Sequence, residues 1–547
     1  MAALPLGVVG NAAAVPALAE NESDRVRALA QRPRHVIGLV FDARVIVGPA
    51  RSQPLVADGN VYVTASYGRL FAVDARTGEE KWAYTAQPAA GVVPCCSGRN
   101  RGAAIDLDKI YLTTLDAQLQ AVDRSSGKLV WRSRMRDPAT GYANFAAPLI
   151  VRGKVVVADA GNGQDLVGEV RAYDPETGEE LWARPTVEGW AGRLDGREST
   201  LTGTLNASWP GESWRRGGGL VPLSPTYDPA LDLLFVGVGS PSPANAWLRP
   251  GANLQTSATL AIAPDTGAIV WGFQGTPNDA WGFGGANEAV PFELTQDGTT
   301  MKALAKADTN GFFFVLDRST GRLLSARPFV DRVSWASGYD ADGRPVETTD
   351  SRPPEPGEAG PTSAPAVQVS PAWLGAKSWM PMAYSERTGL FYVPANEWGM
   401  DLWYDPVVDL DGTPVAGAGS HVKPLDPQSV GVLRAIDPVT GARKWEYRNR
   451  GPIWGGVLAT AGGLVFVGTP EGYLLALDDE TGKLLWKFNT GSAVLGPPIT
   501  WELDGAQYIA VVSGWDGPPA VWGDAVAATV SRTNAGGALW AFRLMPN

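Results

Sequence analysis

Short runs of alternating apolar and polar residues recur along the chain, and turn residues separate them. This alternation predicts half-buried β-strands, since successive side chains of a strand point to opposite faces. A phrase recurs with the runs: a small residue, an apolar residue, usually Asp, a turn ending in Thr-Gly or Ser-Gly, then an apolar pair and usually Trp. Its seven copies lie at 72–82, 121–131, 172–182, 261–271, 315–325, 435–445 and 476–486. Self-similarity at a period of roughly 40–50 residues predicts a β-propeller or a solenoid.

The repeated phrase is typical of a β-hairpin. Its glycine supplies the positive φ that the turn needs, and the Asp or Thr side chain can bond the turn backbone. The Trp that follows offers a broad apolar surface that can wedge between neighbouring sheets. A second hairpin precedes most copies, for example at 54–63, 148–158 and 459–468, so that two hairpins make one four-stranded blade.

The expected fold is an all-β, eight-bladed β-propeller with Trp-docking repeats, closed by both chain ends. Seven blades follow from the phrases, and residues 536–544 supply strand material for one more. Radial closure hides the sheet edges. Because a propeller spreads one fold over the chain, we expect a single domain at 35–547.

The residues before that domain resemble an export signal. Residues 1–19 carry no charged side chain and end in Ala-Leu-Ala before Glu20, which is typical of a secretory cleavage site, although no basic residues precede it. We therefore expect a leader and linker at 1–34 and a periplasmic or secreted protein. The alternative is a disordered apolar leader.

Charge and hydropathy exclude several classes of partner. The net charge is −11 and basic residues do not cluster, which argues against nucleic acid or an anionic membrane surface. No apolar run reaches 18 residues, so no membrane span is expected.

The chain has only two cysteines, Cys95 and Cys96, and they are adjacent. Either they form a strained disulfide between neighbours or they are two reduced, buried thiols. No Cys-x-x-Cys-His motif exists, so covalent haem is not expected, and neither is a Cys-rich metal site.

Several long segments resemble the quinoprotein alcohol dehydrogenases, which are periplasmic eight-bladed propellers that use pyrroloquinoline quinone (PQQ) and a Ca²⁺ or lanthanide ion. The resemblance lies in segments 93–102, 209–219, 226–243, 276–288, 306–329, 379–401 and 453–492. It implies that Cys95 and Cys96 form a vicinal disulfide beneath the quinone ring and that Arg101 contacts the cofactor. It also places Trp379 and Trp454 near the same pocket.

This chain has different residues at the positions that bind the metal ion, carry out catalysis and contact the cofactor in that family. The resemblance places Gly163 and Ser240 where the Glu and Asn metal ligands belong, Gly282 where the catalytic Asp belongs, and Gly284 where lanthanide enzymes have a further Asp. Other cofactor contacts are replaced by Arg51, Phe145, Pro222, Thr309 and Ser378.

These replacements lead to the expectation that the pocket has no metal site and works without PQQ. A hard divalent ion needs several oxygen ligands, including carboxylates, and hydride abstraction from an alcohol needs a nearby base. Nearby acids that might compensate are Asp165, Asp279 and Glu288, although each is also explained as a solvated or structural carboxylate.

Three functional hypotheses remain. The first is a propeller whose axial pocket binds or converts a small organic molecule without PQQ. The second is a PQQ-dependent alcohol dehydrogenase with a non-standard metal site, which uses PQQ and Ca²⁺. The third is a non-catalytic scaffold that binds proteins. The sequence favours the first, because so many cofactor positions are replaced.

Overall fold

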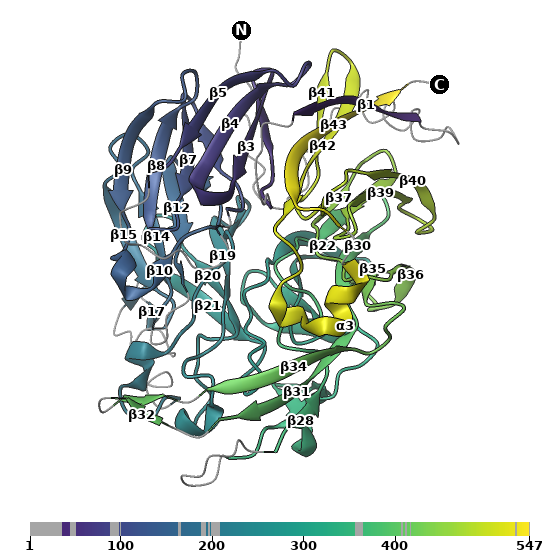
Figure 1. Cartoon of the computed structure of the whole chain (residues 1–547). Coiled ribbons are helices and arrows are strands. Elements are labelled where there is room, and N and C mark those ends of the chain that lie inside the picture. The colour runs from purple at the N-terminus through teal and green to yellow at the C-terminus, as the bar shows by residue number, and fades with distance from the viewer. Residues whose placement is uncertain are drawn as a thin grey trace.

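The computed structural model describes residues 36–43, 51–87, 98, 100–161, 166–187, 193–194, 197–198, 208–355, 365–405, 408–410, 413–415, 417–530 and 533–545. Within these residues the chain forms eight antiparallel four-stranded sheets, so the predicted all-β propeller class is confirmed. Seven of the sheets are built from successive segments of the chain, some of them interrupted by insertions, and the eighth joins strands from near the two ends of the chain (Figure 1).

The first four sheets follow one another along the chain. The first contains β2 (Leu55–Ala57), β3 (Asn60–Ala65), β4 (Arg69–Asp74) and β5 (Glu80–Thr85). The second contains β6 (Ala104–Asp106), β7 (Lys109–Thr113), β8 (Gln118–Asp123) and β9 (Leu129–Arg134). The third contains β11 (Leu149–Val151), β12 (Lys154–Ala158), β14 (Glu169–Tyr173) and β15 (Glu180–Pro185). The fourth contains β18 (Thr226–Asp228), β19 (Leu233–Val238), β20 (Ala258–Ile262) and β21 (Ile269–Gln274).

The other four sheets complete the series. The fifth contains β22 (Val290–Gln296), β23 (Thr299–Ala307), β24 (Phe312–Asp317) and β25 (Leu323–Pro328). The sixth contains β29 (Ala383–Ser385), β30 (Leu390–Asn396), β35 (Gly431–Ile436) and β36 (Arg443–Asn449). The seventh contains β37 (Val457–Ala459), β38 (Leu464–Gly468), β39 (Tyr473–Asp478) and β40 (Leu484–Asn489). The eighth contains β41 (Ile499–Leu503), β42 (Ala506–Trp515), β43 (Gly536–Met545) and β1 (Val36–Ala43).

Apolar clusters join each sheet to the next and close the ring. One cluster packs Val63 and Phe71 of the first sheet against Val512 and Leu539 of the eighth, and comparable clusters fill the other junctions. Because both faces of a sheet meet a neighbour, the inner strands β3, β7 and β38 are almost wholly buried. The core is therefore a circle of inter-sheet layers rather than one central mass.

The tryptophan and the glycine of the repeated phrase explain how neighbouring sheets dock. The indole N–H of the phrase tryptophan donates to a carbonyl in the turn of the next sheet, as Trp131 does to Pro175 O at 3.1 Å. The ring then covers the turn glycine, so that a Cβ added at Gly178 would lie 2.6 Å from Trp131 Cε3. Four more tryptophans make the same pair of contacts, namely Trp82, Trp182, Trp271 and Trp445.

This docking predicts that Gly178→Ala destabilises the ring. The added methyl would meet both Trp131 and Ser133 at a φ of +73°. We expect the free energy of unfolding to fall by about 2–4 kcal/mol, the sum of left-handed backbone strain and overpacking. Gly59→Ala is the matched control, since its φ is +74° and nothing lies within 4 Å of the added carbon. Urea unfolding measures both, and equal losses would show that docking contributes nothing.

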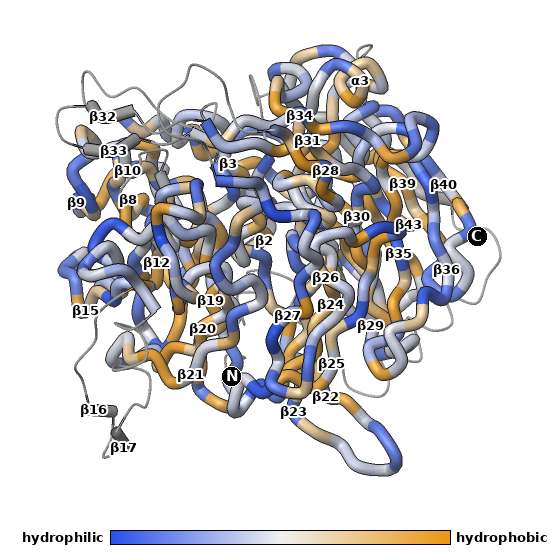
Figure 2. Tube along the Cα trace, turned by 90° about the horizontal axis from the view of Figure 1, so that it is seen from below, coloured by the Kyte–Doolittle hydropathy of each residue, from blue (hydrophilic) through white to orange (hydrophobic). Residues whose placement is uncertain are grey.

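Insertions between the strands of the propeller gather at one end of the ring. The sheet β28 (Val367–Val369), β31 (Trp398–Tyr404) and β34 (Ala418–Pro424) lies there with α3 (Gly523–Ala527), away from the two chain ends (Figure 1). Four two-stranded ribbons accompany the described sheets: β10 (Tyr142–Ala143) with β13 (Ala160–Gly161), β16 (Arg193–Leu194) with β17 (Arg197–Glu198), β26 (Ala336–Tyr339) with β27 (Pro345–Glu347), and β32 (Val408–Leu410) with β33 (Thr413–Val415). Hydrophilic residues occupy the tip of the long β22–β23 hairpin, which extends from the body (Figure 2).

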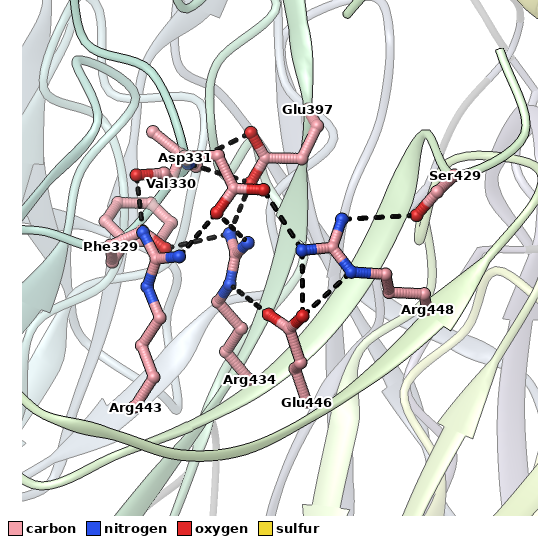
Figure 3. A network of polar contacts seen from close by, with 9 residues as sticks. All are labelled: Phe329, Val330, Asp331, Glu397, Ser429, Arg434, Arg443, Glu446 and Arg448. Carbon is pink, nitrogen blue, oxygen red and sulfur yellow. Dashed lines mark hydrogen bonds and ion pairs between the residues drawn. The ribbon is translucent and has the colours of Figure 1, made fainter. Parts of the chain in front are cut away.

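An ionic network with a buried centre fastens the fifth sheet to the sixth (Figure 3). Its centre is Arg434 on β35, whose side chain is 0% exposed and which pairs with Glu397 and Asp331. Arg434 Nη1 also donates to the carbonyl of Phe329 at 2.9 Å. Strand β36 adds three more charged side chains to the network, namely Arg443, Glu446 and Arg448. The network thus contains three guanidinium groups and three carboxylates, so its charges cancel.

Candidate functional site

A cavity lies on the axis of the ring, because the residues that line it come from the starts of seven of the eight sheets. Together with the open solvent at its mouth, the cavity measures about 730 Å³. It has room for a few waters or a small organic molecule. Its lining comprises Arg51, Gln53, Leu55, Arg101, Gly102, Ala103, Ala147, Pro148, Leu149, Leu223, Ser224, Glu288, Trp379, Pro381 and Pro497.

Glu288 brings a carboxylate to the wall of this cavity. It lies two residues before β22. Its Oε2 accepts from Lys377 Nζ at 2.6 Å, and its Oε1 accepts from the Met382 amide at 2.8 Å. Both side chains of the ion pair are buried, at 4% and 0% exposed. Burial lowers the pKa of Lys377, and the adjacent Glu288 carboxylate opposes that shift. Glu288 is therefore a buried acid that reaches the cavity from a fixed position.

A second buried ion pair lies behind the first. Lys306 Nζ lies 3.2 Å from Asp308 Oδ2, and both side chains are 2% exposed. Burial raises the pKa of Asp308 although Lys306 and the backbone amide of Thr309 favour its charged form. Asp308, like Glu288, opposes the fall in the pKa of Lys377 that burial causes, so the two pairs form one electrostatic cluster beside the cavity.

Arg101 crosses the cavity from the second sheet to the sixth. Its guanidinium carbon lies 4.4 Å from the centre of the Trp379 ring and 5.5 Å from that of Phe145. Contacts of this kind attract a cation to the ring face and fix the plane of the guanidinium group. Arg101 and Trp379 both line the cavity, whereas Phe145 is outside the lining and supports Arg101 from the side.

Asp279 holds a turn rather than facing the cavity. Its Oδ1 accepts from the amides of Trp281, Gly282 and Phe283, and its Oδ2 accepts from the amide of Gly284 and from Ser257. The side chain is 1% exposed and is not among the residues that line the cavity. Gly282 and Gly284 adopt φ values of +74° and +65° in this turn. The carboxylate is thus used to order the backbone.

The remaining expected site residues lie in different surroundings. Trp454 packs between Trp398 and Trp522, with ring centres 5.5 and 5.3 Å away. Thr309 donates its hydroxyl to Asn287 at 2.7 Å, and Ser240 accepts through its carbonyl from the Gly219 amide. Pro222 lies next to the lining residue Leu223 but does not itself line the cavity. Cys95, Cys96, Asp165 and Gly163 lie outside the described residues.

The structure therefore brings together four of the expected residues, namely Arg51, Arg101, Glu288 and Trp379. Sequence reasoning missed Lys377, which supplies the counter-ion of Glu288. A signal for it exists, because Lys377 is a lone charge between small and apolar residues just before Trp379. In the part of the chain that is described, no group of three or more His, Cys, Asp or Glu side chains is placed to hold a metal ion.

Two family models match the chain. The model described as "Glucose/ethanol/alcohol dehydrogenase, beta-propeller domain", a PQQ domain, matches residues 46–326. The model described as "Outer membrane protein assembly factor BamB" matches residues 429–542. The described residues of both segments include strands of the ring of sheets.

The chain is also similar to individual enzymes. It is 49% identical over 499 residues to "Quinoprotein alcohol dehydrogenase PedH" of Pseudomonas putida, covering 90% of this chain and 84% of that protein. It is 47% identical over 519 residues to "Quinoprotein ethanol dehydrogenase" of Pseudomonas aeruginosa, with 90% and 83% covered. Among solved structures, "Europium-containing methanol dehydrogenase" superimposes with a TM-score of 0.83 at 32% identity, covering 95% of this chain and 100% of that one.

These findings correct one expectation. The replaced cofactor contacts suggested a pocket that works without PQQ, but the PQQ-domain model and relatives at 43–49% identity named as quinoproteins or quinone-linked dehydrogenases contradict it. The expectation is wrong because single replacements around a large ligand change how it is held without showing that it is lost. The second hypothesis therefore has the better support.

Proposed function

Because the chain belongs to the quinoprotein alcohol dehydrogenase family, we propose that it is a PQQ-dependent oxidoreductase that oxidises alcohols. The observation that carries this proposal is the similarity to quinoprotein alcohol dehydrogenases over nine-tenths of the chain. The axial cavity supports it, since it joins cations, a flat aromatic ring and a buried carboxylate in one place.

The donor set of the cavity fits PQQ. The cofactor is a planar, anionic ortho-quinone that carries carboxylates, and a guanidinium group binds carboxylates through paired N–H bonds. Arg101 would hold one of them, and Trp379 offers an aromatic face next to it. When bound, PQQ supplies a two-electron acceptor, which no side chain can replace.

The chain's own contribution to the reaction is a base. Oxidation of a primary alcohol to an aldehyde removes two electrons and two protons, and one of the protons leaves the hydroxyl oxygen. Among the described residues, Glu288 is the carboxylate that lines the cavity, and we propose that it accepts this proton. Lys377 Nζ, 2.6 Å from Glu288 Oε2, holds the carboxylate in a fixed position before the substrate arrives. The leucine and proline side chains of the lining exclude water from the reacting oxygen.

The described residues do not fit a divalent ion at this cavity. Each buried acid beside it already has other partners: Glu288 has Lys377, Asp308 has Lys306, and Asp279 has backbone amides. A Ca²⁺ ion takes six to eight oxygen ligands, several of them carboxylates.

Reconstitution tests the proposed function. We expect the protein incubated with PQQ to retain it in stoichiometric amount through gel filtration, because a buried guanidinium–carboxylate pair dissociates slowly. The loaded protein should reduce an artificial electron acceptor when a primary alcohol is added. Ultraviolet–visible spectra and dye reduction measure the two results, with Ca²⁺, with La³⁺ and with neither. Loss of PQQ on the column together with no dye reduction in any condition would refute the proposal.

We further propose that residues 35–547 act as one propeller domain, that 1–34 form a leader and linker, and that the protein is periplasmic or secreted. An oxidised Cys95–Cys96 pair would suit that compartment. Among the described residues, no helix has the length and apolar character needed to cross a membrane. N-terminal sequencing of the exported protein checks the leader.

A further inference from the structure

Asn287 joins the proposed base to a distant segment of the site. It directly precedes Glu288, it is 2% exposed, and it is not among the residues that line the cavity. Its Oδ1 accepts from the amide and from the hydroxyl group of Thr309, at 3.0 and 2.7 Å. Its Nδ2 donates to the carbonyl of Ser378 at 2.6 Å and to that of Lys377 at 3.3 Å. A buried amide group that uses both of its ends in this way fixes the segments that it joins.

The segment bound by Asn287 carries two side chains of the site. Lys377 is the buried counter-ion of Glu288, and Trp379 provides the ring on which the guanidinium group of Arg101 lies. The two carbonyl groups that accept from Asn287 belong to Lys377 and to the residue before Trp379. One amide group, on the residue next to the proposed base, therefore holds the backbone from which both side chains start.

Thr309 completes the connection. The amide of Ala376 donates to the carbonyl of Thr309 at 2.9 Å, and a Cβ added at Gly375 would lie 2.7 Å from Thr309 Cγ2. Thr309 thus contacts the segment directly, while its own amide and hydroxyl group bond Asn287. Hydrogen bonds in a closed, buried arrangement strengthen one another, and removal of one partner leaves buried polar groups unsatisfied. The arrangement should therefore be sensitive to the loss of a single amide group.

From these contacts we propose that Asn287 is a positioning residue that keeps Lys377 and Trp379 in place relative to Glu288. This inference rests on the proposed function and adds a residue to its site. Trp379 borders the proposed cofactor pocket and Lys377 holds the base, so release of their shared backbone should weaken PQQ binding and slow the reaction together. Loss of the base alone would slow the reaction without that loss of affinity.

The test measures PQQ affinity by fluorescence titration and kcat at saturating PQQ in Asn287→Ala. We expect the Kd of PQQ to rise and kcat for a primary alcohol to fall, each by about 10- to 100-fold, as for other groups that orient a residue of a binding site. The control is Asn396→Ala, because Asn396 is 0% exposed and its amide group bridges to the backbone of Ile453 in a similar way. It should lose stability in urea and leave both values unchanged. Equal changes in the two variants would overturn the inference.

Two milder variants keep the inference testable if Asn287→Ala does not fold. Thr309→Val preserves the shape of the side chain and removes the hydroxyl donor to Asn287, whereas Thr309→Ser retains that donor. Thr309→Val should raise the Kd of PQQ about 3- to 10-fold, which corresponds to one neutral hydrogen bond, and Thr309→Ser should stay close to the wild type. Wild-type affinity in Thr309→Val would contradict the inference.

Hydrogen exchange separates this inference from the proposed function, because it needs no cofactor. The amide of Met382 donates to Glu288 at 2.8 Å and so reports on the contact between the base and this segment. In the protein without PQQ, peptides that cover 376–382 should exchange faster in Asn287→Ala than in the wild type, while peptides of β35 should not change. Unchanged exchange at 376–382 would overturn the inference. Faster exchange there, with a wild type that neither retains PQQ nor reduces the dye, would instead refute the proposed function.

Discussion

Replacing Glu288 by glutamine is expected to lower kcat for alcohol oxidation by about 10²–10⁴-fold, the range that a general base contributes. Glutamine has nearly the same shape, and its carbonyl can still accept from the Met382 amide as Oε1 does at 2.8 Å. It cannot take up the hydroxyl proton at neutral pH. KM should change little, because the loss concerns proton transfer rather than binding. Steady-state kinetics of the PQQ-loaded variant measures the change.

A control variant is needed that also removes the charge of Lys377. In Glu288→Gln the Lys377 side chain, which is 0% exposed, loses its counter-ion, and an unpaired buried charge costs about 3–5 kcal/mol. The double variant Glu288→Gln/Lys377→Met removes that charge and should recover stability while kcat stays low. Glu293→Gln, an acid 54% exposed on β22, should leave kcat unchanged. A double variant with wild-type kcat would show that Glu288 is not the base.

Replacing Arg434 by alanine is expected to lower the free energy of unfolding by about 3–5 kcal/mol, the cost of breaking a buried ion pair from one side. Arg434 is 0% exposed and pairs with Glu397, which is 3% exposed and would keep an uncompensated charge. It also bonds the carbonyl of Phe329 in the connection between two sheets. Urea unfolding measures the loss. Arg443→Ala, an outer member of the network at 32% exposed, should cost less than about 1 kcal/mol.

The loss of stability in Arg434→Ala should depend on pH, because Asp331 belongs to the same network. Burial raises the pKa of Asp331, but the guanidinium groups of Arg434, Arg448 and Arg443 together lower it below its ordinary value. A carboxyl group with a lower pKa in the folded state stabilises the fold above its unfolded pKa of about 3.9, and this contribution disappears as the pH falls through the folded pKa. The difference in stability between wild type and Arg434→Ala should therefore shrink below about pH 4. A constant difference down to pH 2 would contradict this origin.

The propeller was predictable from the sequence because its repeats are local. Each hairpin turn, with its Asp and its glycine, is set by a few neighbouring residues, and the tryptophan that docks the next sheet lies within the same phrase. Trp131 and Gly178 show the rule, since the spacing of one repeat brings the ring over the glycine of the next. The smaller sheet β28–β31–β34 was not predicted, because its strands lie in insertions that do not share the repeat.

The site was only partly predictable because its geometry depends on contacts between distant sheets. Asp279 and Glu288 both flank Gly282 in sequence, yet one orders a turn and the other reaches the cavity. Their difference comes from Lys377, which is 89 residues away from Glu288 along the chain. Trp454 was expected near the pocket, but it packs against Trp398 and Trp522. The replaced residues at the cofactor positions also led to the wrong expectation that the pocket works without PQQ.

The pairing of β1 with β43 sets the order in which the molecule can be completed. Residues Val36 and Met545 are register partners, so the eighth sheet joins nearly opposite ends of the polypeptide. During synthesis the other sheets can assemble as their segments leave the ribosome, since each is built from a limited stretch of chain. The circle itself stays open until the last strand has been translated. A chain interrupted late in synthesis would therefore expose unpaired strand edges, which makes it a substrate for chaperones and proteases rather than a smaller functional enzyme.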